Sequence, residues 1–175
     1  IDVILSHIND TTGNSIKPTD LTGWDLEPLG LSVEALRESA HHMFCQDYIE
    51  PYEGAETVLW EIYERTKEPL LFITGRNDPG TARRQLESLN WPVRLPEMIV
   101  TGGDRDKRTY LRETGANFII EDDERHLMDY MENGVGVGLM VQPWNRKCSI
   151  PVTCKFDQWD DIREFFVQGF CESKS

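Results

Sequence analysis

Short apolar runs alternate with amphipathic stretches along most of the chain. The apolar runs have the length and composition of buried strands and occupy residues 70–74, 98–101, 117–121 and 135–141. Apolar positions recur at helical spacing over residues 54–66, 81–90, 107–114, 124–132 and 159–166. Strands that alternate with helices are typical of βαβ units. The pattern therefore predicts an α/β protein with a Rossmann-like parallel sheet flanked by helices.

The last of these helices has a clear apolar face. Trp159, Ile162, Phe165 and Phe166 recur at helical spacing, and we expect all of them to belong to the core.

The first fifty residues follow a different pattern, in which turn-forming residues are frequent. One clear helix is predicted over residues 33–45, and Ser32 is placed to cap its start. Pro51 and Gly54 then interrupt regular structure before the first strand. We therefore divide the chain into a small helical cap region, residues 1–50, and a Rossmann-like core domain, residues 51–175.

The charge and composition narrow the choice of partners. The 175 residues carry a formal net charge of -13, which repels nucleic-acid polymers and anionic membrane surfaces. No apolar run approaches the ~20 residues that span a bilayer. The four cysteines form no Cys-x-x-Cys pair, which favours reduced thiols and a cytoplasmic location. A small anionic ligand would need a local positive centre.

The first predicted strand ends in groups suited to phosphate binding. Thr74 offers a hydroxyl and a backbone N–H, and Gly75 allows a phosphate oxygen to approach the main chain. Arg76 follows directly. Lys107 begins a later helix, where its ammonium and the backbone N–H groups can hold an anion together.

A run of acidic residues ends the third predicted strand. Glu121, Asp122, Asp123 and Glu124 are consecutive, which is electrostatically unfavourable unless a cation compensates them. Mg²⁺ suits such a position, because it takes one or two carboxylates together with waters and phosphate oxygens. Asp123 and Glu124 also suit the start of the next helix. Since the carboxyl ends of parallel strands share one edge of a sheet, this run should lie near Thr74.

Thr74, Lys107 and Asp122, in this order at or just past strand ends, resemble the last three motifs of the haloacid-dehalogenase-like phosphatases. Further segments are similar to the 5'(3')-deoxyribonucleotidase-like family within that superfamily, namely residues 8–26, 50–55, 72–76 and 142–146. The resemblance covers nearly the whole chain. It implies a Mg²⁺-dependent phosphatase that acts on (deoxy)nucleoside monophosphates through an aspartyl-phosphate.

The resemblance also implies a role for each matched residue. Thr74 and Lys107 would be catalytic, and the phosphate would be bound by Thr74, Gly75, Arg76 and Lys107. Asp122 would bind Mg²⁺, with Glu121 and Asp123 as flanking candidates for the same role. Trp24 in the cap is a candidate for stacking on a base. The expected partner is a small phosphorylated substrate, a nucleotide, and a homodimer is left open.

One motif of the family is missing, because no strand ending in Asp-x-Asp is present to supply the nucleophile and the acid/base. In one register, residues 1–8 are already the first cap helix and Asp-x-Asp lies upstream of Ile1. In the other, residues 3–6 are a degenerate central strand, and His7 and Asn9 replace the two aspartates. The second register would make the protein a catalytically inactive nucleotide-binding or protein-interaction module of the same fold.

Overall fold

A computed structural model describes residues 2–23, 29–46, 48–89, 97–102 and 107–172. The helices are α1 (Asp2–Thr12), α2 (Val33–Phe44), α3 (Ala55–Thr66), α4 (Pro79–Glu87), α5 (Arg108–Thr114), α6 (Leu127–Glu132) and α7 (Trp159–Glu172). The strands are β1 (Leu71–Thr74), β2 (Glu97–Val100), β3 (Phe118–Glu121), β4 (Gly136–Met140) and β5 (Cys154–Phe156). Short 3-10 helices are η1 (Pro18–Asp20), η3 (Glu124–His126) and η4 (Pro143–Asn145).

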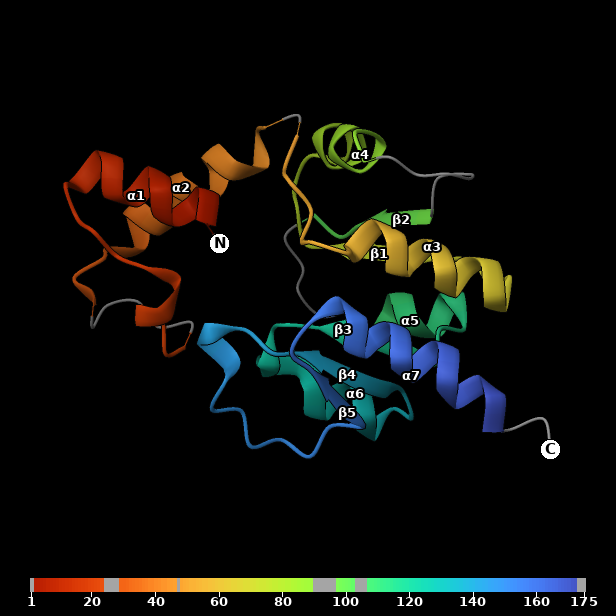
Figure 1. The fold of residues 1–175 in the computed structure, drawn as a ribbon. Coiled ribbons are helices and arrows are strands. Elements are labelled where there is room, and N and C mark those ends of the chain that lie inside the picture. Colours follow the sequence, from red (N-terminus) through yellow and green to blue (C-terminus); the bar gives the residue numbers. More distant parts are fainter. Residues whose placement is uncertain (1, 24–28, 47, 90–96, 103–106, 173–175) are drawn as a thin grey trace.

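All strand pairs in this part of the chain are parallel, as predicted. β1 pairs with β2, while β3, β4 and β5 form a second sheet in that order. The carboxyl ends of the strands face the side on which α1 and α2 lie (Figure 1). Among the described residues no ladder joins β1 to β3. The α/β class is therefore confirmed, but the expected single sheet is replaced by two.

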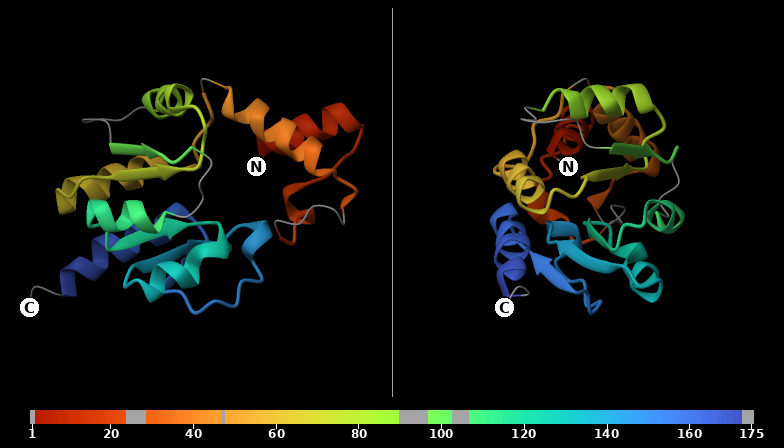
Figure 2. Two further views of the ribbon diagram at one scale, coloured as in Figure 1. Left: turned by 180° about the vertical axis from the view of Figure 1, so that it is seen from behind. Right: turned by 90° about the vertical axis from the view of Figure 1, so that its right-hand side faces the viewer.

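Helices cover both faces of the larger sheet (Figure 2). On β4, Val137 and Leu139 are fully buried in a cluster with residues of α5 and α6. Met140, on the opposite face, packs in a second cluster with residues of α3, β5 and α7. This alternation is what a pleated strand between two helical layers requires.

Side-chain packing, instead of backbone pairing, holds the two sheets together. Ile73 of β1 packs against the cluster formed by α5, α6 and β4, although it belongs to the smaller sheet. Leu70, just before β1, packs against the α3–α7 cluster. Apolar burial of this kind needs no strand-to-strand ladder.

The cap is a pair of helices with a core of its own. Leu5 and Ile8 of α1 are buried against Leu21 and Leu31, and the fifth buried member of this cluster is Trp144 of η4. Ser32 caps α2 as predicted, since its Oγ accepts a hydrogen bond from the backbone N–H of Ala35 at 3.1 Å. Trp144, a residue of the predicted core domain, is therefore part of the hydrophobic core of the cap.

The register that made residues 3–6 a central strand is wrong. These residues lie in α1, where the buried positions Leu5 and Ile8 recur at helical spacing. The His7 ring stacks on His42 of α2, with centroids 4.3 Å apart. The Asn9 side chain donates to the carbonyl of Ile16 and accepts from its N–H, both at 2.9 Å. His7 and Asn9 therefore do not replace catalytic aspartates on a strand.

The other predicted elements form within a few residues of their expected bounds, with instructive differences. β5 was not predicted, because its three residues are too few to show an alternating pattern. Helix α7 runs on to Glu172. Ile162 is fully buried, whereas the expectation that Phe165 is core is wrong, since it is 39% exposed. Cys45, Cys148 and Cys154 are free, and no described helix is long and apolar enough to cross a membrane.

Gly138 on β4 offers a test of this packing. A Cβ placed there would lie 2.5 Å from Phe156 and 3.2 Å from Phe118, so the glycine makes room for the two rings. We expect Gly138→Ala to lower the free energy of unfolding in urea by about 1–3 kcal/mol through overpacking. Adding Phe156→Leu should relieve the clash, so that the double variant loses less than the sum of the two single losses. Simple additivity would contradict this account.

Candidate functional site

The loops after β1 and β2 are joined at the carboxyl edge of the smaller sheet. Thr74 ends β1 in register with Val100 of β2. Past this point the N–H of Thr101 donates to the Thr74 carbonyl at 2.9 Å, and the N–H of Gly102 donates to the Arg76 carbonyl at 3.1 Å. The backbone around Thr74 and Gly75 is therefore held in place, as a phosphate-binding turn requires.

Lys107 and Glu121 form an ion pair at the edge of the larger sheet. The Lys107 ammonium, at the start of α5, donates to Oε2 of Glu121, the last residue of β3. The side chains are 17% and 8% exposed, respectively. Glu121 Oε1 accepts from the N–H groups of Asp122 and Asp123, at 3.1 Å and 3.3 Å. Glu121 thus orients the lysine and shapes the acidic turn.

The three carboxylates expected at a metal site make different contacts in the structure. Asp123 caps η3 by accepting from the N–H of Arg125 at 3.1 Å, and it also pairs with the Arg125 guanidinium. The alternative in which Asp123 begins the next helical element is therefore confirmed. Asp122 forms no ion pair in the described structure.

The charge on Asp122 is unfavourable in this environment. Burial raises the pKa of Asp122 to about 6, and the neighbouring Glu121 carboxylate adds to this shift, while Lys107 opposes it. A cation at this position would remove the penalty. Among the described residues, however, no three His, Cys, Asp or Glu side chains converge as a complete metal site. Any metal held here would need ligands in addition to Asp122.

Arg76 lies between the turn at Thr74 and Gly75 and the cap. Its guanidinium sits 5.3 Å from the centroid of the Phe44 ring at the end of α2, and burial lowers the Arg76 pKa. Gln85 of α4 donates to the carbonyl of Met43, at 3.4 Å, and to that of Gln46. The end of the cap helix is thus tied to the core beside Thr74. Trp24, the predicted base-stacking residue, lies outside the described residues.

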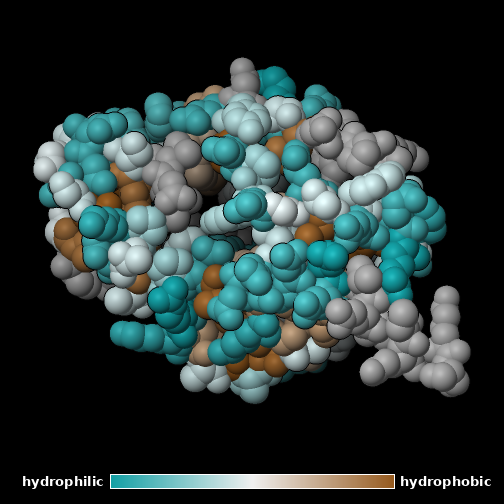
Figure 3. All heavy atoms as spheres, in the orientation of Figure 1, coloured by the Kyte–Doolittle hydropathy of each residue, from teal (hydrophilic) through white to brown (hydrophobic). Residues whose placement is uncertain are grey.

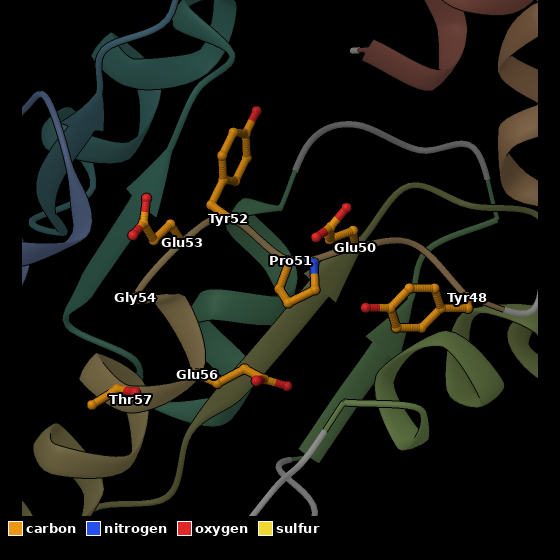
Figure 4. A pocket seen from close by; sticks show the side chains of 8 residues that line it. All are labelled: Tyr48, Glu50, Pro51, Tyr52, Glu53, Gly54, Glu56 and Thr57. Atoms are coloured by element: carbon orange, nitrogen blue, oxygen red, sulfur yellow. The ribbon is translucent and has the colours of Figure 1, made fainter.

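The segment that returns from the cap to α3 lines a pocket of about 210 Å³ (Figure 4). Three of its lining residues are glutamates, Glu50, Glu53 and Glu56. The hydroxyl of Tyr48 points toward Pro51 in this view. An acidic lining repels phosphate, so we do not place the phosphate in this pocket. The molecular face in Figure 3 is mainly hydrophilic, and hydrophobic side chains appear only as separate small areas.

Asn145 contacts the candidate site although no sequence motif predicts a role for it. It is 1% exposed and donates through Nδ2 to the Asp122 carbonyl at 2.8 Å. It lies in the 142–146 segment that carried part of the family resemblance, but a local pattern gives no sign of a partner 23 residues away.

Comparison of the chain with protein-family models, with curated proteins and with solved structures gives no match in any of the three. The functional interpretation therefore depends on the motifs and on their arrangement at the sheet edge.

Replacing Lys107 should reveal how much the ion pair contributes. Lys107→Met leaves the Glu121 carboxylate buried without its partner, so we expect a loss of about 3 kcal/mol in the free energy of unfolding. Lys107→Met with Glu121→Gln should recover most of it, because the uncompensated charge is removed. Lys67→Met breaks an exposed pair with Glu64 and should change stability by less than about 1 kcal/mol. Equal losses in the two single variants would contradict the assigned role.

The raised pKa of Asp122 predicts an unusual pH dependence of stability. A carboxyl whose pKa is higher in the folded than in the unfolded chain destabilises the fold above that pKa, and the penalty fades as pH falls from about 6 toward about 4. Asp122→Asn should therefore be more stable than the parent by about 1–3 kcal/mol at pH 7.5, with a smaller gain at pH 4.5. Urea unfolding at the two pH values measures this. Asp160→Asn, which removes an exposed carboxylate, should show no such gain.

Proposed function

We propose that this protein is a Mg²⁺-dependent phosphatase of the haloacid-dehalogenase-like type, acting on (deoxy)nucleoside monophosphates. The observation that carries the proposal is the split between the sheets, with Thr74 at the end of β1 and the Lys107–Glu121 pair beside Asp122 at the end of β3. Unpaired strand edges are normally covered or extended by another strand. A parallel strand between β1 and β3 would end between the hydroxyl on one side and the ammonium and carboxylate on the other.

The nucleophile in this proposal is the first aspartate of an Asp-x-Asp that ends such a strand, in a segment preceding the cap. The helical conformation of α1 supports this arrangement, because it leaves residues 3–6 unsuited to the strand themselves. The second aspartate would protonate the leaving nucleoside oxygen and later activate the water that hydrolyses the aspartyl-phosphate.

Residues of this chain at the carboxyl ends of the strands would bind and orient the phosphate. The Thr74 hydroxyl and the N–H groups near Gly75 can donate to its oxygens, and Arg76 adds positive charge at the same edge. Lys107, already oriented by Glu121, can stabilise negative charge that develops on the transferred group. These contacts act mainly through positioning and electrostatics, which dominate phosphoryl transfer.

Asp122 would hold the metal. A single carboxylate from this chain fits Mg²⁺, which keeps several waters and binds phosphate oxygens directly, and the nucleophilic aspartate could supply a further ligand. When bound, Mg²⁺ neutralises charge on the phosphate. The raised pKa of Asp122 supports a cation here, since a cation would favour the ionised carboxylate. Glu121 and Asp123 serve to support the turn in this arrangement.

Phosphate release from a panel of deoxynucleoside monophosphates, with the full-length protein and Mg²⁺, tests the proposal. We expect Asp122→Asn to abolish turnover and Thr74→Val to lower kcat by about 10²-fold, because it removes one donor to the phosphate. Asp160→Asn, which removes an exposed carboxylate in the first turn of α7, should leave turnover unchanged. Undiminished turnover in Asp122→Asn would overturn the assignment. Nucleotide binding without any phosphate release would favour the non-catalytic alternative.

A further inference from the structure

We infer that Asn145 is a positioning residue that orients Asp122 toward the metal and, through its neighbour Trp144, couples this orientation to the cap. The inference deepens the proposed function and depends on Asp122 being a metal ligand. It is carried by hydrogen bonds and packing that meet in two consecutive residues of η4.

Asn145 uses its side-chain amide in three hydrogen bonds. Nδ2 donates to the carbonyls of Asp122 and Met140, at 2.8 Å and 2.9 Å, while Oδ1 accepts from the N–H of Gln142 at 2.8 Å. Two carbonyls on one side and an N–H on the other permit only one orientation of the amide. Because Asn145 is almost completely buried, water cannot replace these bonds.

The hydrogen bond from Asn145 holds the backbone of Asp122 at a position that the β3–β4 ladder does not reach. The ladder between β3 and β4 ends with Glu121 opposite Leu139, so Asp122 is the first residue beyond it. Its N–H is held by Glu121 Oε1, and its carbonyl is held by Asn145. The peptide planes on both sides of the Asp122 Cα are therefore fixed, and with them the direction in which its side chain leaves the backbone.

The residue before Asn145 belongs to the cap. Trp144 is 5% exposed and is buried with Leu5, Ile8, Leu21 and Leu31, all of them cap residues. A displacement of the cap relative to β4 must therefore move η4 or break this cluster. Through Asn145, such a displacement reaches the turn that carries Asp122. In this way the cap, where substrate selectivity would lie, is mechanically connected to the metal-binding carboxylate.

Asn145→Asp is the sharpest test, because it keeps the size and the acceptor for Gln142 but replaces the donor that faces two carbonyls. It also adds negative charge near the site, which by itself would strengthen cation binding. We expect it to raise, by about 10- to 100-fold, both the Mg²⁺ concentration for half-maximal turnover and the Mn²⁺ dissociation constant measured by electron paramagnetic resonance. Asn145→Ala serves as a second variant and should shift both values in the same direction.

Two controls separate positioning from general destabilisation. Asn133→Asp removes the same kind of bond, from Nδ2 to the Asp129 carbonyl at 2.7 Å, at the end of α6. Ile162→Val weakens the apolar cluster formed by α3, β5 and α7 without removing a hydrogen bond. Neither should alter the metal requirement at a temperature where all variants are folded. A Trp144→Leu variant should resemble Asn145→Asp in weakening Mn²⁺ binding.

The outcomes distinguish this inference from the proposed function. The positioning role alone would be overturned if Asp122→Asn lost metal binding while both Asn145 variants kept two values unchanged. These values are the Mg²⁺ concentration for half-maximal turnover and the Mn²⁺ dissociation constant. Mn²⁺ binding that depends on Asp122 and Asn145 but without turnover would retain the positioning role and overturn the phosphatase. Mn²⁺ binding that is absent from the parent, or unaffected by Asp122→Asn, would overturn both.

Discussion

The ion pair between Lys107 and Glu121 is the interaction on which the candidate site depends. It joins the start of α5 to the end of β3 in a nearly buried position. Because a buried carboxylate is stable only with a partner, the pair fixes the lysine and the strand end together. The second oxygen of Glu121 then organises the backbone of the next two residues. Asp122 is left partly buried and close to the like charge of Glu121, which Lys107 offsets only in part.

Apolar packing and polar contacts stabilise different parts of the fold. Apolar clusters on the two faces of β4 hold the larger sheet between its helices, and single side chains such as Ile73 attach the smaller sheet. Polar contacts instead gather at the carboxyl edge, where parallel strands leave backbone groups without ladder partners. The Asn145 amide compensates for one of these missing partners at Asp122.

Residues of the cap contact the core domain at several places. The hydrophobic core of the cap contains Trp144, and the second helix of the cap is tied to the core domain through Gln85 and through the Phe44–Arg76 contact. These links come from three separate parts of the sequence and meet around the strand ends. A ligand bound between the cap and the strands would therefore affect the position of the turns that surround it.

Most of the helices and strands, the α/β class and the parallel direction of the strands follow from local periodicity and short connections, whereas α1 and the three-residue β5 do not. Local motifs also place Thr74 and Asp122 at or just past strand ends and Lys107 at the start of a helix. The helical conformation of residues 3–6 depends on their packing in the cap, since a short apolar run suits a strand or a helix until its neighbours are known. Long-range contacts likewise decided which acid pairs with Lys107, which caps η3, and that Asn145 supports Asp122. Partners 14 and 23 residues apart leave no periodic signal, because their meeting is set by how strands and helices pack.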